Sequence, residues 1–455
     1  MSFIRSISGL RATLSDGLIP SILSNYAAGF SSILGEGPII VGNDGRPSGK
    51  WIEQIIIATL QACGREVISI GMVPTPTVQL MTEHSNAVGG IAVTASHNPG
   101  QWNGLKFLNS SGVFLDLDEN LKLWEAVDNE NFVFSKNILF PEVISDNNAI
   151  EKHISRILDL DLFTKSDILE KIKKRRFKIV VDAVNASGSY AVVKLLEKFG
   201  CEIIKLYCGG TGIFPHTPEP IAENLTDLCS ATFSQEADLG IAVDPDADRL
   251  VLIGKDGIPI GEEKTIALAT LAVLKFSHLF ETDFQKSIVV NLSTSRMSSD
   301  IASQFNTQVF TSSVGEINVV KKMKEVSAII GGEGSGGVIL PACHYGRDSL
   351  IGIALVLSLL AESGNELISQ SNELPQYEMI KMKKEFTGDI SKIIQKFLIE
   401  FKEGTPINQD GLKINFSDSW IQIRSSNTEP IIRIIAEAKT KDEAEKLAKR
   451  GMDLI

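Results

Sequence analysis

Three stretches of the chain repeat one pattern: an apolar segment, a short polar turn, an amphipathic segment, a Gly or Asn, and a second apolar segment. They lie at 38–71, 177–207 and 287–313. Strand–helix–strand units of this length pair their strands in parallel through right-handed crossovers. The repeat therefore predicts an α/β fold with three similar mixed α/β domains, each a sheet flanked by helices.

The predicted helix in each repeat ends at a residue that adopts a left-handed backbone at low cost. These residues are Gly64, Gly200 and Asn306. Glycine lacks a Cβ atom and asparagine tolerates positive φ, so both are typical of helix C-termini. We expect positive φ at all three positions.

The last part of the chain has a different pattern. Residues 412–424 alternate apolar and polar side chains around a short turn, which predicts an antiparallel hairpin, and an apolar strand follows at 431–438. A final helix opens with Thr440 and Glu443 at capping-box spacing. We expect a smaller α+β domain, with the chain divided into 1–145, 146–255, 256–370 and 371–455.

Composition excludes several classes of protein. With 455 residues, a net charge of −12 and no long basic tract, the chain does not suit a nucleic-acid or acidic-membrane partner. The apolar run at 350–361 predicts a buried helix and is too short for a membrane span. Five scattered cysteines without a CxxC pair, six histidines without metal-ligand spacing and no secretion signal predict reduced thiols in the cytoplasm, with no zinc site and no disulfides.

A serine lies in a tight turn within "TASHNPGQWNGLKF", residues 94–107. Ser96 is flanked by His97 and followed by Asn98-Pro99-Gly100, after an apolar strand. Taken alone, these turn-forming residues are typical of an ordinary surface loop. Three further motifs make a functional loop the better interpretation.

Three aspartates alternate in "DPDADR", residues 244–249, directly after a predicted strand. Asp244, Asp246 and Asp248 can converge on one hard cation, and α/β sheets bind ligands at such strand ends. Arg249 and Lys255 stand where an EF-hand needs Gly and Glu, which excludes that motif. A solvated acidic turn and a phosphatase with a nucleophilic aspartate stay open.

Two further loops have side chains suited to a phosphosugar. In "GGEGSGG", residues 331–337, Glu333 and Ser335 offer an acceptor and a hydroxyl beside a backbone that a ligand can approach closely. "RSSNTEP", residues 424–430, together with a nearby arginine, favours oxyanion binding over a plain polar turn. The anion-binding candidates are Arg424, Ser426, Asn427, Thr428 and Arg433.

The set and order of these motifs resemble the α-D-phosphohexomutase family over essentially the whole chain. "TASHNP" and "RSSNTEP" are its most specific motifs here, and "GEGSGG" is looser. Further similarity lies in "SGLRATL", "GNDGRPSG", "SVGEINVV" and the "DG" at 410–411. The resemblance implies four domains around a central cleft and an isomerase that interconverts hexose 6-phosphate and hexose 1-phosphate.

The resemblance also implies residue roles. Ser96 should carry the phosphoryl group, and Mg²⁺ should bind the three aspartates and a serine phosphate oxygen. Arg11 and Arg249 should stabilise negative charge in the transition state. Lys106 is the first choice as general base and His97 the second, although either can instead be an ion-pair partner of the phosphate.

For the substrate, Glu333 and Ser335 should read the ring hydroxyls, while the 424–430 loop holds the non-reacting phosphate. A hexose 1,6-bisphosphate should be both intermediate and primer, and a mobile fourth domain should exclude water. We expect a monomer or homodimer acting on glucosamine phosphate, with phosphomannomutase/phosphoglucomutase activity as the alternative. A metal-dependent phosphatase using Asp244 and a non-catalytic phosphosugar-binding protein are the rival hypotheses.

The chain departs from the family pattern at two positions. Many relatives have a histidine where this sequence has Gly337, and His344 or Arg347 can be expected to reach that space. Many relatives also have glycine at the position of Ala247, a small change that should preserve the metal loop.

Overall fold

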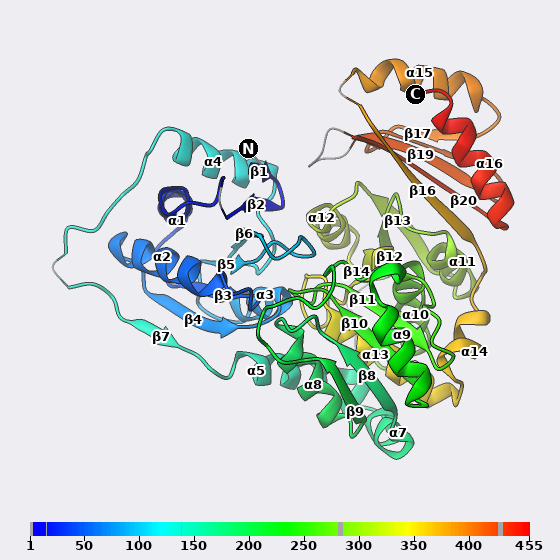
Figure 1. Cartoon of the computed structure of the whole chain (residues 1–455), viewed down its shortest axis with the longest axis horizontal. Coiled ribbons are helices and arrows are strands. Elements are labelled where there is room, and N and C mark those ends of the chain that lie inside the picture. Colours follow the sequence, from blue (N-terminus) through cyan, green and yellow to red (C-terminus); the bar gives the residue numbers. More distant parts are fainter. Residues whose placement is uncertain (1–2, 15, 138, 281–284, 387, 426–430) are drawn as a thin grey trace.

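Four β-sheets organise the chain in the computed structural model, which describes residues 3–14, 16–137, 139–280, 285–386, 388–425 and 431–455 (Figure 1). The first sheet has the strand order β1-β2-β6-β5-β3-β4-β7. Its strands are β1 (Phe3–Ser6), β2 (Gly9–Thr13), β3 (Ile39–Asn43), β4 (Val67–Met72), β5 (Gly89–Val93), β6 (Trp102–Asn109) and β7 (Val143–Ser145). Its helices are α1 (Pro20–Ile33), α2 (Gly49–Ala62), α3 (Thr75–Glu83) and α4 (Leu117–Asp128).

The second sheet has the order β11-β10-β8-β9 and the third the order β13-β12-β14-β15. Strands of the second are β8 (Lys178–Asp182), β9 (Glu202–Tyr207), β10 (Leu239–Val243) and β11 (Leu250–Gly254), with helices α5 (Ala149–Leu158), α6 (Asp161–Thr164), α7 (Ile168–Arg175), α8 (Gly188–Lys198) and α9 (Thr226–Ser234) and the 3₁₀ turn η1 (Ala222–Asn224). Strands of the third are β12 (Gln285–Asn291), β13 (Gln308–Ser312), β14 (Ala328–Glu333) and β15 (Gly337–Ile339), with helices α10 (Glu262–Lys275), α11 (Met297–Gln304), α12 (Glu316–Val326), α13 (Ser349–Ser363) and α14 (Leu367–Asn372).

The predicted similarity of the first three domains is confirmed by their strand pairing. β3, β8 and β12 each lie between two parallel neighbours, as the repeat required. In each domain the third strand of the unit then pairs antiparallel with the strand that follows: β5 with β6, β10 with β11, and β14 with β15. The three loops inside these hairpins therefore occupy equivalent places: 94–101, 244–249 and 334–336. We call them the serine loop, the aspartate loop and the sugar loop.

The predicted sugar loop is shorter than the sequence indicated. Residues 331–333 belong to β14 and Gly337 begins β15, so three residues connect the strands. Gly331 and Gly332 lie in the strand and not in a turn, and close packing against neighbouring atoms leaves no room for a side chain at either position. A Cβ atom at Gly331 would lie 2.4 Å from the Met323 sulfur, and one at Gly332 would lie 2.2 Å from the Gly337 carbonyl oxygen.

The predicted helix ends are confirmed. Gly64, Gly200 and Asn306 have φ values of +82°, +71° and +51°. The predicted buried helix is also confirmed, because residues 349–360 of α13 are buried. Among the described residues, no helix is both long and apolar enough to cross a membrane.

The C-terminal sheet is antiparallel throughout, with the order β16-β20-β19-β18-β17. Its elements are β16 (Glu378–Glu385), β17 (Thr405–Ile407), β18 (Leu412–Asn415), β19 (Trp420–Ser425), β20 (Ile431–Ala438), α15 (Ile390–Glu400) and α16 (Lys441–Met452). The predicted hairpin is present, with Leu412 opposite Ile423, and the Thr440 hydroxyl caps α16 by accepting from the Glu443 amide. The sequence-based division near 145, 255 and 370 stays our proposal for the domain boundaries.

The hydrophobic cores separate the C-terminal domain from the rest. One continuous core includes Val78, Ile179 and Ile288 and so joins the first three domains. Phe397 and Ile434 belong to a different core within the C-terminal domain, which lies apart from the N-terminal sheet in Figure 1. The C-terminal domain can therefore change its stability without disturbing the joint core.

Phe397→Ala should loosen the C-terminal domain alone. Removing this fully buried ring should cost about 3–5 kcal/mol of stability. Hydrogen exchange should show lost protection in residues 405–452 and unchanged protection in 38–360. Phe199→Ala, in the joint core, is the matched control. It should lower protection within 38–360 and leave protection in 405–452 unchanged. Equal loss of protection everywhere in Phe397→Ala would contradict separate cores.

Candidate active site

A cleft of about 860 Å³ receives side chains from all four domains. This volume lies in the range that small-molecule sites usually have. The structure brings most of the predicted site residues to this cleft. The lining includes Arg11, His97, Lys106, Arg249, Glu333, Ser335, Arg424 and Arg433. Ser426, Asn427 and Thr428 lie outside the described residues.

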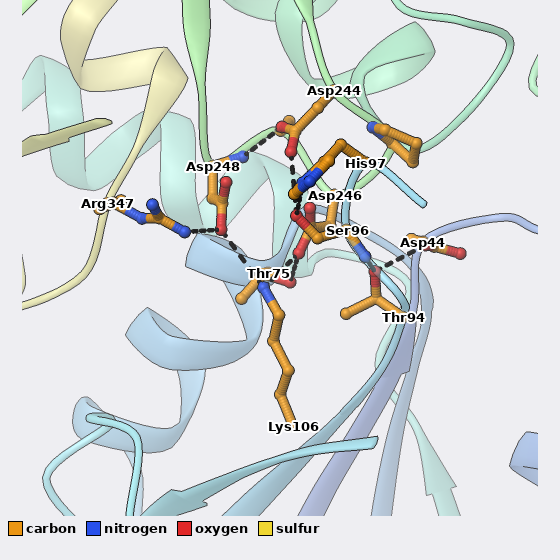
Figure 2. Close-up of polar contacts among 12 residues, drawn as sticks. Asp44, Thr75, Thr94, Ser96, His97, Lys106, Asp244, Asp246, Asp248 and Arg347 are labelled. Carbon is orange, nitrogen blue, oxygen red and sulfur yellow. Dashed lines mark hydrogen bonds and ion pairs between the residues drawn. The ribbon is translucent and has the colours of Figure 1, made fainter. Parts of the chain in front are cut away.

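Ser96 occupies a constrained position in the serine loop. Its φ is +51°, and its amide donates to the Thr94 hydroxyl at 2.8 Å. Its hydroxyl oxygen lies 3.3 Å from Asp244 Oδ2 and 3.3 Å from His97 Nδ1 (Figure 2). The left-handed turn thus directs the serine hydroxyl toward the aspartate loop of the next domain.

Arg46 fixes the serine loop through hydrogen bonds to main-chain carbonyls. Its fully buried guanidinium donates to four main-chain carbonyls of this loop and of β6, at 2.6–3.0 Å, and its Nε donates to Asp44 at 3.0 Å. The carbonyls belong to Ser96, Asn98, Pro99 and Trp102. No role was predicted for Arg46 from the sequence, although it lies within the "GNDGRPSG" motif.

The three aspartates converge as their spacing predicted. Asp244, Asp246 and Asp248 are fully buried, and one carboxylate oxygen of each lies within 4.8 Å of the others. Among the described residues, Asp246 Oδ1 and Asp248 Oδ1 have no hydrogen-bond partner. Buried carboxylate oxygens without partners are costly, and oxygen is the ligand that Mg²⁺ prefers. The three residues therefore fit a divalent cation.

Two cations from other domains approach the aspartates. Lys106, on β6, lies 2.6 Å from Asp246 and 3.2 Å from Asp248. Arg347, just before α13, lies 2.6 Å from the same Asp248 oxygen (Figure 2). Burial, followed by the charges of Asp248 and Asp246, raises the pKa of Asp244 well above its usual value. Burial also acts to raise the pKa of Asp248, but Arg347 and Lys106 together hold it below its ordinary range.

The two candidate bases have opposite electrostatic settings. Burial acts to lower the pKa of Lys106, but Asp246 and Asp248 raise it above its ordinary value. Arg249, burial and Arg11 lower the pKa of His97 well below its ordinary value. His97 is therefore neutral near pH 7. Lys106 is protonated as long as Asp246 and Asp248 contact only protein side chains.

Arg347 fills the space beside Gly337. A Cβ atom at Gly337 would lie 2.3 Å from Arg347 Cδ, so this arginine, rather than His344, occupies the position next to the sugar loop. Its Nη1 donates to Glu333 at 2.7 Å and its Nε to Glu316 at 3.1 Å. Arg347 and His344 were the two residues predicted for this space, and the structure places Arg347 there.

Arg424 and Arg433 face the same end of the cleft. They lie opposite each other on β19 and β20, and Arg424 pairs with Asp410 at 3.4 Å. Lys381, on β16, lines the cleft as well and binds Glu262 of α10 at 2.6 Å. The C-terminal domain thus contributes a concentration of positive charge suited to a phosphate.

Comparison with known proteins shows the class to which this fold and site belong. The chain matches the α/β/α domains I, II and III of phosphoglucomutase/phosphomannomutase at residues 4–134, 152–257 and 263–377, and the C-terminal domain of the same family at 380–454. The protein is therefore a member of the phosphoglucomutase/phosphomannomutase family, the α-D-phosphohexomutases, which are isomerases.

Particular relatives cover nearly the whole chain. A phosphoglucomutase/phosphomannomutase of Thermococcus kodakarensis is 34% identical over 98% of this chain and 97% of its own. A probable phosphoglucosamine mutase of Methanopyrus kandleri is 30% identical over 98% and 96%. The crystal structure of a Burkholderia thailandensis family protein, 24% identical, covers 98% of this chain and 96% of its own with a TM-score of 0.85, which supports the fold.

Arg46→Lys should lower turnover more than substrate binding. Lysine keeps the charge beside Asp44 but cannot donate to four carbonyls, which leaves buried acceptors unsatisfied at a cost of roughly 1–3 kcal/mol. We expect kcat to fall on the order of a hundredfold with a small change in KM. Arg65→Lys is the matched control, because Arg65 donates to the carbonyls of Ser31 and Leu34 away from the cleft. Equal activities of the two variants would refute a positioning role.

Gly337→Ala should displace Arg347 from its carboxylates. The added methyl group would overlap the arginine side chain, so we expect kcat/KM to fall on the order of tenfold to a hundredfold, about 1.4–2.8 kcal/mol. Gly35→Ala is the control, because a Cβ atom there would meet nothing within 4 Å. Steady-state kinetics of both variants checks this, and an unchanged Gly337→Ala enzyme would contradict it.

Proposed function

We propose that the protein interconverts hexose 6-phosphate and hexose 1-phosphate through a phosphorylated Ser96, with glucosamine phosphate as preferred substrate. The observation that carries this proposal is the position of the Ser96 hydroxyl, 3.3 Å from Asp244, beside a cleft lined by all four domains. Family membership supports the activity but leaves the hexose open.

The proposed reaction has two phosphoryl transfers. In the first, the Oγ–P bond of phosphoserine 96 breaks while a sugar hydroxyl oxygen forms a new O–P bond, and the hydroxyl proton passes to a base. This yields a hexose 1,6-bisphosphate, which turns around in the cleft. In the second transfer, the O–P bond at the opposite end of the sugar breaks while Ser96 Oγ forms a new O–P bond, and the base returns the proton to the freed sugar oxygen. Added hexose 1,6-bisphosphate primes the cycle by phosphorylating Ser96.

Asp244, Asp246 and Asp248 would hold Mg²⁺, with a phosphoserine oxygen as a further ligand. The ion supplies a Lewis acid that offsets the charges of the carboxylates and the phosphoserine. Arg11 and Arg249 lie at the cleft, where their charges would stabilise the transferring phosphoryl group. Asp246 and Asp248 raise the pKa of Lys106 through their negative charges. This effect would weaken once the two carboxylates hold the cation, so that Lys106 could lose its proton and act as a base. We keep Lys106 as the proposed general base and the neutral His97 as its alternative.

The rest of the cleft would position the substrate. Glu333 and Ser335 would bind ring hydroxyls, and Arg424 and Arg433 would bind the non-reacting phosphate. Ser426, Asn427 and Thr428 were predicted to assist there and stay predictions. A cytoplasmic location and a monomeric or homodimeric state also stay predictions.

Two buried carboxylates that share one guanidinium support an amino sugar. Glu316 and Glu333 both border the cleft and share one guanidinium, that of Arg347. Burial raises the pKa of Glu316 to about 7, which reflects poor compensation of its charge. The 2-ammonium group of glucosamine phosphate would supply the missing positive charge. Relatives called phosphoglucosamine mutases agree with this preference, whereas the Thermococcus kodakarensis relative agrees with the phosphomannomutase/phosphoglucomutase alternative.

Intact-mass measurement of the phosphorylated enzyme tests this function. Wild-type protein primed with hexose 1,6-bisphosphate should carry one phosphoryl group, and Ser96→Ala should carry none. In single turnovers, glucosamine 6-phosphate should remove the group at least tenfold faster than mannose 1-phosphate or glucose 1-phosphate. Ser293→Ala, which alters another serine of the cleft, is the matched control and should be phosphorylated normally.

Three outcomes would overturn the proposal. Equal phosphorylation of Ser96→Ala, or phosphate release to water without transfer to any sugar, would favour the metal-dependent phosphatase that uses Asp244. Failure of every sugar to remove the group would favour a phosphosugar-binding protein. Faster removal by mannose or glucose phosphate would refute only the amino-sugar preference.

A further inference from the structure

A second cluster of potential metal ligands lies apart from the cleft. Among the described residues, His153, Cys343, His344 and Asp348 place their ligand atoms within 4.8 Å of one another. Each residue is at most 1% exposed. His153 comes from α5, whereas the other three come from the segment between β15 and α13. None of the four lines the cleft.

Two imidazoles converge on one carboxylate oxygen. His153 Nε2 lies 2.9 Å from Asp348 Oδ2, and His344 Nε2 lies 3.1 Å from the same atom. Zinc binds nitrogen and carboxylate oxygen at about 2.0–2.2 Å with tetrahedral angles, which separates neighbouring ligands by roughly 3.3–3.5 Å. These three ligand atoms therefore need only slight separation to surround a zinc ion.

The surrounding hydrogen bonds orient the ligands as a second shell would. The Thr77 hydroxyl lies 2.9 Å from His153 Nδ1 and so directs the opposite nitrogen toward Asp348. The Leu350 amide donates to Asp348 Oδ1 at 2.8 Å and leaves Oδ2 for the imidazoles. Partners of this kind fix the orientation of metal-binding histidines and carboxylates.

A free thiol beside His344 completes the candidate ligand set. Among the described residues, His344 Nδ1 has no hydrogen-bond partner although the ring is almost fully buried. Cys343 is a free, buried cysteine beside it. Because Nε2 is the His344 nitrogen that faces Asp348, the case for zinc rests on the gathered ligand atoms and not on the free Nδ1. Cysteine sulfur and histidine nitrogen are both common zinc ligands.

Although the spacing of cysteines and histidines along the chain predicted no zinc site, we propose that His153, Cys343, His344 and Asp348 form a closed, structural Zn²⁺ site. Binding would release the Cys343 proton to solvent, so that one thiolate and one carboxylate balance the two charges of the ion. Sulfur and imidazole ligands favour zinc over magnesium, in contrast to the three aspartates of the cleft. With four protein ligands and no solvent access, the site would have no open position for catalysis.

The location of the cluster gives the ion a structural role. It would join α5 to the start of α13, with Thr77 of α3 as a neighbour, and so connect the first three domains. Asp348 adjoins Arg347, the arginine that contacts Glu333 in the cleft. Zinc would thereby fix the beginning of α13 and the segment that positions this arginine.

Metal analysis of untagged protein tests the site. After purification with zinc and removal of loosely bound metal by EDTA, elemental analysis should find about one zinc per chain. Replacement by Co²⁺ should give a cobalt–thiolate charge-transfer band in the near ultraviolet. Cys343→Ser should abolish the band and reduce zinc retention by about tenfold or more. Asp246→Asn, at the three aspartates, is the matched control and should retain both signals.

The wild-type measurements decide the question even where a variant folds poorly. Absence of retained zinc together with absence of the cobalt–thiolate band in folded wild-type protein would show a hydrogen-bonded cluster only and overturn the proposal. Persistence of the band in folded Cys343→Ser would assign it to another of the five cysteines and would overturn it equally. Circular dichroism confirms folding in each case.

Discussion

The attraction between three buried carboxylates and two cations from other domains governs the arrangement of the site. Burying ionised groups costs several kcal/mol each unless they are paired. Asp246 and Asp248 obtain their closest ion-pair partners when Lys106 from the first domain and Arg347 from the third approach the second. Correct packing of three domains is therefore a condition for an electrostatically acceptable aspartate loop. Within the described part of the chain, Asp246 Oδ1 and Asp248 Oδ1 have no hydrogen-bond partner, and a divalent cation could bind these two oxygens.

The repeated hairpin explains how distant motifs meet. In each of the first three domains, the strand β5, β10 or β14 is followed by an antiparallel neighbour. The functional loop connects these two strands. Parallel strands end at one edge of a sheet, which is where such folds bind ligands. Arg46 then fixes the serine loop through main-chain carbonyls, so the position of Ser96 depends on backbone geometry more than on neighbouring side chains.

Much of this organisation could be predicted from residues near each other in the chain. Strand–helix–strand units, the helix ends at Gly64, Gly200 and Asn306, and the C-terminal hairpin all follow from local patterns, and the structure confirms them. The roles of two arginines, Arg46 and Arg347, were harder to predict from the sequence. Arg46 acts on a loop about fifty residues away, and Arg347 acts on an aspartate 99 residues away, so neither has a local signal of its role.

By itself, the sequence determined the α/β class, the repeat and which residue types stand at the strand ends, because strand and helix periodicity and turn chemistry are local properties. Only the tertiary structure decided which side chains share a site. It placed Arg347 rather than His344 beside Gly337, and it brought His153 to Cys343, His344 and Asp348. Contacts between residues nearly two hundred positions apart depend on how whole domains pack, and spacing along the chain contains no record of that packing.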